Sequence, residues 1–217
     1  LEGWTFVDYV EEWLDRVRVI GARVPAARFG GPDVAASSDW VPRFGKAVQG
    51  ERLGALTGHY YAEGPPDDPA VTIVRLLAGN AKVAEETREI AAAAKRERRV
   101  YRMTEGNSCY RGGKPGMSDA FAVSLWAADY LLTLAANWCA GANLHGGQSK
   151  YLTAGLGGHT PGMNVAKGPQ AMPSGFYTPI KSEPGAAMRA MPVYYGMLMA
   201  NQLAGTTMLH CDVDRQD

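Results

Sequence analysis

Short apolar segments alternate with helical segments along nearly the whole chain. The first helical segment, residues 5–24, begins at Thr5 with an acidic residue three positions later, a capping-box spacing, and stops before Pro25. The segments expected to be strands are 27–35, 52–64, 99–108, 137–147 and 206–213, and those expected to be helices are 39–50, 69–97, 119–136 and 193–203. Gly79 and Asn80 are expected to bend the 69–97 helix, and Ser118 to cap the 119–136 helix. Such alternation predicts an α/β fold with a parallel sheet covered by helices.

The first four strand segments each start with apolar residues and finish in groups that hydrogen-bond or react. These groups are Asp33, His59 and Tyr60, Glu105 and Asn107, and Asn143 and His145. Barrels of parallel strands carry their active site at the carboxyl ends, and ligands of open doubly wound sheets also lie beyond the strand ends. No G-x-G-x-x-G motif follows the first strand, which disfavours a dinucleotide-binding sheet and favours a fold of the (β/α)8 TIM-barrel type.

Four strand–helix units are too few to close a barrel, because closure normally takes eight strands. An open half leaves two unpaired edges and an uncovered interior. We therefore expect this chain to be the second half of such a barrel, with residues 1–205 forming the partial catalytic domain. The remaining half of the barrel, or a partner chain, would complete it. The first six residues lack an initiator Met and a signal-peptide pattern, so the chain is expected to start within something longer.

Charge and cysteine content argue against several kinds of partner. Lysine plus arginine and aspartate plus glutamate both number 22, so the net charge is zero and no basic field attracts nucleic acid or an anionic membrane. The longest apolar stretch, residues 120–144, contains Asp129, which is costly in hydrocarbon, so a buried helix and strand are expected rather than a membrane span. Three cysteines without ligand-type spacing indicate neither a disulfide framework nor a zinc site, and no cofactor is expected.

Glu105 stands at the carboxyl end of the third strand, directly before a glycine-rich loop. A carboxylate at a strand end is most often an ordinary surface group. Here Gly112, Gly113 and Gly116 let the backbone approach a ligand closely, and exposed N–H groups in such a loop can receive an anion such as a carboxylate. The combination points to a site that binds an anionic substrate beside Glu105.

The segment that carries Glu105, TEGNSCYRGGKPGMSDAFAVSLWAADYL, resembles the seventh strand, loop and helix of glycoside hydrolase family 79, which contains the heparanases and bacterial β-glucuronidases. Other segments agree in order, namely ARFGGPDVA, GHYY, FYTPI and MPVYYGMLMANQL. The resemblance runs over nearly the whole chain and is most specific around Glu105. It implies a retaining enzyme built on a (β/α)8 barrel, with residues 206–217 starting a following β-sandwich domain that is mostly absent.

The resemblance also implies a clamp for the carboxylate of the sugar. Tyr110 and the backbone of Gly112 would bind that carboxylate, and a tyrosine from the loop after the eighth strand, either Tyr151 or Tyr177, would complete the clamp. Arg111 stands where many relatives have glycine. An arginine beside a uronate carboxylate is chemically favourable if its side chain points inward.

A retaining glycosidase needs two carboxyl groups about 5–5.5 Å apart. The resemblance implies that Glu105 is the nucleophile and that the general acid is a Glu following an Asn at the end of the fourth strand. No Asn-Glu pair occurs in this sequence, and the first helix resembles the element that follows it, so the acid/base residue is expected upstream of Leu1. Asp33, Glu63 and Glu183 are weaker local substitutes.

The remaining polar residues at the strand ends each have two interpretations. His59 and Tyr60 are placed either to hydrogen-bond Glu105 or the sugar, or to pack beneath a loop. Asn143 and His145 either line a subsite or only cap the loop that follows them.

The sequence thus predicts a retaining glycoside hydrolase that acts on β-linked glucuronic-acid residues in a glycan or small glucuronide. This chain would carry the nucleophile but not the acid/base, and would be inactive by itself. Two alternatives stay open: a barrel glycosidase acting on neutral sugars, and a non-catalytic carbohydrate-binding half-barrel that needs a partner chain. If the resemblance holds, the protein is extracellular or periplasmic.

Overall fold

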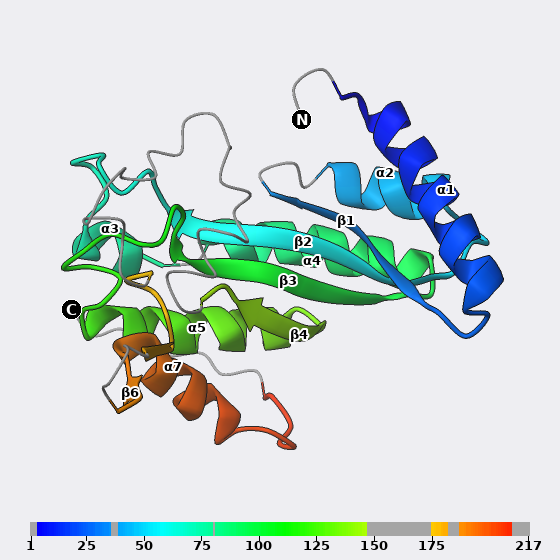
Figure 1. Cartoon of the computed structure of the whole chain (residues 1–217). Helices are drawn as coiled ribbons and strands as arrows, with labels where there is room; N and C mark the ends of the chain where they lie inside the picture. The colour runs from blue at the N-terminus through cyan, green and yellow to red at the C-terminus, as the bar shows by residue number, and fades with distance from the viewer. Residues whose placement is uncertain (1–3, 36–38, 80, 147–174, 182–186, 210–217) are drawn as a thin grey trace.

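The computed structural model describes residues 4–35, 39–79, 81–146, 175–181 and 187–209 (Figure 1). The helices are α1 (Phe6–Arg23), α2 (Trp40–Ala47), α3 (Ile73–Leu77), α4 (Ala81–Arg96), α5 (Ala122–Ala136) and α7 (Pro192–Asn201). The strands are β1 (Phe29–Ala35), β2 (Leu53–Glu63), β3 (Val100–Cys109), β4 (Cys139–Leu144), β5 (Ile180–Lys181) and β6 (Arg189–Ala190). Strands and helices alternate through β4 and α5, as the sequence predicts.

The main sheet has the strand order β1-β2-β3-β4, and each neighbouring pair is parallel. The predicted α/β fold with a parallel sheet is therefore confirmed. Within the described part of the chain, β1 and β4 are the edge strands, and β5 and β6 pair with each other in a separate antiparallel ribbon.

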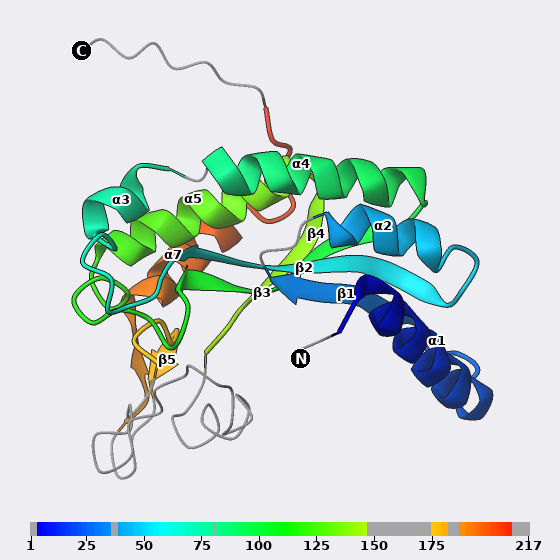
Figure 2. The ribbon, with the colours of Figure 1, turned by 90° about the horizontal axis from the view of Figure 1, so that it is seen from above.

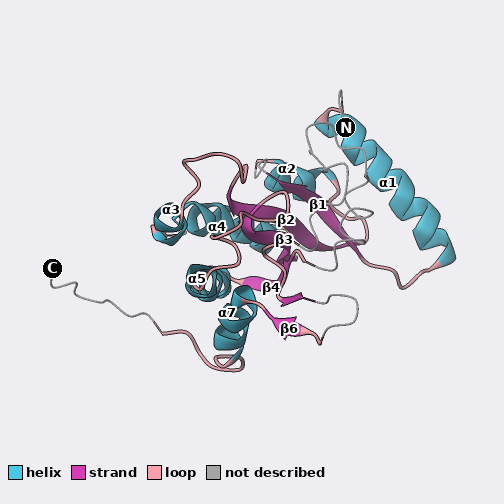
Figure 3. Cartoon of the chain, turned by 60° about the vertical axis from the view of Figure 1, so that its left-hand side comes forward, coloured by secondary structure: helices cyan, strands magenta, loops and turns pink. Residues whose placement is uncertain are grey.

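Helices α4 and α5 cover one face of the sheet, with α2 beside β1 at the far end of the same layer (Figures 2 and 3). Their apolar faces meet the sheet in a continuous core whose largest buried members include Phe44, Leu56, Tyr101, Trp126 and Tyr130. No helix from the described ranges lies over the opposite face of β2 and β3 (Figure 2). That uncovered face is where the polar ends of the strands gather.

Local contacts fix the helices at the two ends of the sheet. The capping box predicted at Thr5 is present, since its hydroxyl accepts from the Asp8 N–H and the Asp8 carboxylate accepts from the Thr5 N–H. Helix α1 is held against β1 by the Trp13 indole, which donates to the Gly30 carbonyl at 3.1 Å. At the other end α7 packs tightly on α5, because a Cβ at Gly196 would lie 2.4 Å from the Ser124 carbonyl oxygen.

Three predictions about element boundaries were wrong or incomplete. The 69–97 helix is broken rather than bent, because Gly79 takes φ +118° between α3 and α4. Ser118 does not cap α5, which begins at Ala122; its buried hydroxyl instead accepts from the Lys114 N–H at 2.9 Å within the glycine loop. Residues 206–209 are exposed and form no strand, and residues 210–217 lie outside the described ranges, so the β-sandwich assignment stays a prediction.

In the portions of the chain that are described, no helix is both long and apolar enough to pass through a lipid bilayer.

Candidate active site

The alternation of β2 determines which of its side chains reach the uncovered face. Leu56 and Tyr60 point into the helix-covered core, where the Tyr60 ring stacks on Tyr130 with centroids 5.7 Å apart. Successive strand residues point to opposite faces, so His59 and Tyr61 point to the uncovered face. Of the two interpretations given for Tyr60, packing applies and a hydrogen bond to Glu105 does not, because the Tyr60 side chain points to the helix-covered face of the sheet.

A bulge in β3 brings Glu105 to the same face. Gly58 pairs with Met103, but the next residue of β2, His59, pairs with Glu105, so Thr104 is an extra residue on β3. As a result Thr104 and Glu105 both turn toward the uncovered face, while the following Gly106 lies beneath the Tyr130 hydroxyl.

Glu105 is half-buried in the carboxyl-terminal half of β3, which continues to Cys109 rather than ending beside Glu105. The Tyr61 hydroxyl donates a hydrogen bond of 2.6 Å to its Oε1 atom. Burial raises the pKa of Tyr61 far above its ordinary value, and the neighbouring Tyr177 and Glu105 raise it further. Tyr61 therefore stays protonated and acts as a fixed donor to the carboxylate. Tyr61 was not among the residues predicted for the site, although its position two residues after His59 was a usable signal.

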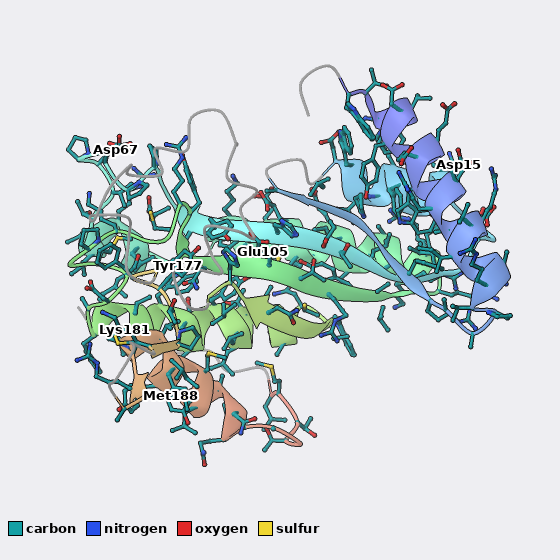
Figure 4. All side chains as sticks on the ribbon, in the orientation of Figure 1. Asp15, Asp67, Glu105, Tyr177, Lys181 and Met188 are labelled. Carbon is teal, nitrogen blue, oxygen red and sulfur yellow. The ribbon has the colours of Figure 1, made fainter. Side chains whose placement is uncertain are left out.

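Tyr177 and His145 close the side of the site opposite β1. Figure 4 shows Glu105 and Tyr177 in the same region of the molecule, whereas Asp15 lies far away on α1. The His145 Nδ1 atom lies 2.8 Å from the Tyr177 hydroxyl and 3.2 Å from the Tyr61 hydroxyl. Tyr177 is only 1% exposed, and its pKa is raised by burial and by the charge of Glu105.

A buried asparagine joins these segments. The Asn107 side chain, which is fully buried, donates through Nδ2 to the carbonyls of His145 at 2.8 Å and Tyr177 at 3.3 Å. Its Oδ1 atom accepts from the Ser108 N–H at 2.8 Å. Asn107 therefore ties the end of β4 and the segment after residue 174 to the strand that carries Glu105.

The glycine loop after β3 lies against the same tyrosines. The Tyr110 ring packs edge-on to the Tyr61 ring at 6.4 Å and rests on Gly64, where a Cβ would lie 2.2 Å from it. The Gly112 carbonyl accepts from the Phe176 N–H at 2.6 Å, so the loop and the Tyr177 segment are bound together. Arg111 is exposed, and its guanidinium lies 5.6 Å from the centre of the Tyr110 ring.

Asp33, His59 and Thr104 form a second polar cluster on the uncovered face. The His59 Nε2 atom lies 3.2 Å from the Asp33 carboxylate, which also accepts from the Thr104 hydroxyl. Burial works against the charged imidazole, but its hydrogen bond to Asp33 and the charges of Glu105 and Asp33 outweigh that cost, so the pKa of His59 is raised. The pKa of Asp33 is lowered, chiefly by its hydrogen bond with His59.

The structure gives mixed outcomes for the other expected positions. Asn143 is exposed on β4, and Tyr151 lies outside the described residues, as does Glu183. The two described substitutes for a second carboxyl group both have structural partners: Asp33 is held by His59, and buried Glu63 pairs with Arg75 at 3.1 Å. Among the described residues no cluster of three or more His, Cys, Asp or Glu side chains could hold a metal ion.

None of the established protein-family models matches this sequence. A β-glucuronidase from Aspergillus niger is 27% identical over 161 residues, which is 65% of this chain and 28% of that enzyme. The chain thus spans less than a third of the length of this relative.

Two solved structures show a similar fold. A 4-O-α-L-rhamnosyl-β-D-glucuronidase from Fusarium oxysporum has a TM-score of 0.57 at 15% identity, covering 94% of this chain and 39% of its own. An arabinofuranosidase has a TM-score of 0.50 at 15% identity, covering 89% of this chain and 35% of its own. At such identities the likeness concerns the fold alone. In sequence the chain is therefore similar to part of a β-glucuronidase, and in fold to part of two glycosidases.

Proposed function

We propose that this chain is the nucleophile-bearing half of a retaining β-glucuronidase related to glycoside hydrolase family 79. The observation that carries the proposal is Glu105 in the carboxyl-terminal half of a parallel strand, accepting a hydrogen bond of 2.6 Å from Tyr61. The sequence similarity to a β-glucuronidase supports the substrate class. The likeness in fold to part of two glycosidases supports the architecture.

In the intact enzyme Glu105 would attack the anomeric carbon of a β-linked glucuronic acid and form a covalent glycosyl ester. The leaving oxygen would take a proton from a Glu supplied by the other half of the barrel. That Glu would then remove a proton from the water that releases the sugar. Tyr61 assists because a hydrogen bond to an ionised group is worth about 1.5–3 kcal/mol and holds the carboxylate in one orientation.

Recognition of the sugar carboxylate is assigned to the corner formed by the glycine loop and the Tyr177 segment. Tyr110 and Tyr177 both lie against Tyr61, with ring centroids 6.4 Å away in each case, and the Gly112 carbonyl is bound to the Phe176 N–H. Hydroxyl and backbone N–H donors suit a carboxylate. Arg111, over Tyr110, would add positive charge at the rim of this corner.

The half-barrel part of the proposal rests on the two parallel edge strands and on the uncovered sheet face. In the described part of the chain β1 and β4 each have one unpaired edge, and the polar strand ends project from the face that no described helix covers. Strands on both sides would continue the sheet into a closed cylinder whose interior is this face. A Glu from that other half would provide the second carboxyl group that the chemistry requires.

The test is turnover of chromogenic substrates by the full-length protein. We expect hydrolysis of an aryl β-glucuronide, and loss of turnover on the order of 10⁴-fold or more in Glu105→Gln. Glu12→Gln, an exposed change on α1, is the matched control and should leave the rate unchanged. Near-normal activity of Glu105→Gln would refute the assignment.

The two alternatives give different outcomes in the same assay. A preference for the aryl β-glucoside over the glucuronide would favour a barrel glycosidase acting on neutral sugars. Binding of glucuronic acid without hydrolysis of either substrate would favour a non-catalytic carbohydrate-binding half-barrel.

A further inference from the structure

The Nδ1 atom of His145 is shared by two tyrosine hydroxyls. It lies 2.8 Å from the hydroxyl oxygen of Tyr177 and 3.2 Å from that of Tyr61. Tyr61 in turn donates to Glu105. The question is which of these groups supplies each proton, because a single nitrogen cannot accept and donate at the same time.

The ionised carboxylate fixes the direction of the hydrogen bonds that link Glu105, Tyr61 and His145. A carboxylate accepts hydrogen bonds only, so the Tyr61 proton must lie in the 2.6 Å bond to Glu105. The Tyr61 oxygen therefore faces His145 as an acceptor, and the contact at 3.2 Å is favourable only if Nδ1 carries a proton. The same N–H then also serves the Tyr177 oxygen, which leaves the Tyr177 proton free to be donated away from the imidazole.

We propose that His145 is a positioning residue whose Nδ1–H fixes the Tyr61 hydroxyl so that its O–H stays directed at Glu105. This inference rests on the proposed role of Glu105 as nucleophile and adds a residue to that site. His145 acts through Tyr61 and need not touch the sugar itself.

The backbone around His145 is built to keep the imidazole in place. Its N–H donates to the Gly106 carbonyl at 3.0 Å, and its carbonyl accepts from Asn107 at 2.8 Å. Both bonds come from the two residues that follow Glu105 on β3. The imidazole and the carboxylate are therefore positioned by the same short piece of strand.

The first test compares two amide substitutions of His145. In His145→Asn the side-chain N–H₂ can take the place of Nδ1–H, whereas in His145→Gln the longer side chain moves the amide toward the position of Nε2. The readout is the rate at which 2-deoxy-2-fluoro-β-D-glucuronyl fluoride labels Glu105 in the full-length protein. In that step a Glu105 oxygen bonds to C1, the C1–F bond breaks, and fluoride leaves with the electron pair, so no proton donor is needed.

We expect the labelling rate of His145→Asn to lie within about twofold of that of the unchanged protein. The labelling rate of His145→Gln should be roughly 3- to 10-fold lower, because the loss of one hydrogen bond changes a rate by about this factor. Thermal melts of both variants serve as the folding control. Equal rates in the two variants would overturn the proposal.

The second test does not depend on activity. Long-range ¹⁵N NMR spectra of the histidine side chains in the full-length protein report which ring nitrogen carries a proton, and the His145→Asn spectrum identifies the signal of His145. A protonated Nδ1 is expected, and a bare Nδ1 would overturn the proposal. If the fluoride labels no residue in the unchanged protein, the proposed function fails, while this spectrum still decides the state of His145.

Discussion

The Tyr61 hydroxyl donates to Oε1 of Glu105 across the β2–β3 pair at 2.6 Å. The two residues lie 44 positions apart in the chain, and the bulge at Thr104 brings them together. This contact gives the carboxylate a fixed donor and links it to His145 and Tyr177. Each of the following predictions tests one part of that arrangement.

Removing the donor should slow the chemistry without unfolding the protein. We expect Tyr61→Phe to lower kcat of the full-length protein on an aryl glucuronide by roughly 10- to 100-fold, because one hydrogen bond to a charged group is lost. Tyr60→Phe is the matched control, since Tyr60 packs on Tyr130 in the core and should change kcat little. Equal effects of the two substitutions would show that the Tyr61 hydroxyl has no special role.

Asn107 should matter for stability as well as for the site. Asn107→Ala leaves the His145 and Tyr177 carbonyls without their side-chain donor in a buried place, at a cost of about 1–3 kcal/mol. For a chain of this size that predicts a fall in Tm of about 2–4 °C per kcal/mol, measured by thermal circular dichroism. Asn143→Ala, at an exposed position on the neighbouring strand, should leave Tm unchanged. A change of less than a degree in Asn107→Ala would contradict the role assigned here.

The Asp33–His59 pair should make stability depend on pH. The pKa of His59 is raised, so its contribution is full below its ordinary value of 6.5 and is lost as pH rises through the raised value. The pKa of Asp33 is lowered, so its contribution is present above its ordinary value of 3.8 and is lost as pH falls through the lowered value.

The pair should therefore stabilise the fold most at about pH 5.5 and much less near pH 9. Asp33→Asn should lower Tm more at the lower pH than at the higher one, by a small difference that corresponds to about 0.5–1 kcal/mol because the pair is partly screened by solvent. Asparagine tolerates the positive φ of 60° at this position. Asp15→Asn, on the exposed face of α1, is the control. An equal loss at both pH values would show that the charge pair is not responsible.

Cys109 should be unreactive in the folded protein. Its side chain is fully buried and its pKa is raised to about 11, by burial first and by the charge of Glu63 second, against the opposing charge of Lys114. In a Cys139→Ala/Cys211→Ala variant, iodoacetamide at about pH 8 should label Cys109 only after denaturant is added, as mass spectrometry can follow. Rapid labelling without denaturant would contradict the burial of this thiol.

The sequence was sufficient for the parts of the fold that rest on local patterns. The alternation of strands and helices, the capping box at Thr5 and the place of Glu105 on β3 follow from spacing and residue type. The break at Gly79 was only half predicted, because a glycine permits both a bend and a left-handed break, and the surrounding packing decides between them.

The site was harder to predict because it depends on which face of its strand each side chain points to, and on contacts between residues far apart in the sequence. Tyr60 and Tyr61 are neighbouring residues of the same type. What distinguishes the one in the core from the one beside Glu105 is which face of β2 each points to, and this depends on how the strand lies against the helix layer. The bulge at Thr104 has no sequence signature of its own. The meeting of His145 with Tyr177 joins segments 32 residues apart, which no local pattern reveals.

The bulge also lets β3 place two functional side chains in succession on one face. If the ladder ran regularly through Thr104, Glu105 would point toward the helix layer, where Gly106 now leaves room for the Tyr130 hydroxyl. Deleting Thr104 would leave Glu105 paired with His59 on the uncovered face, but it would remove the hydroxyl that donates to Asp33. The extra residue therefore allows one strand to serve both Asp33 and Tyr61.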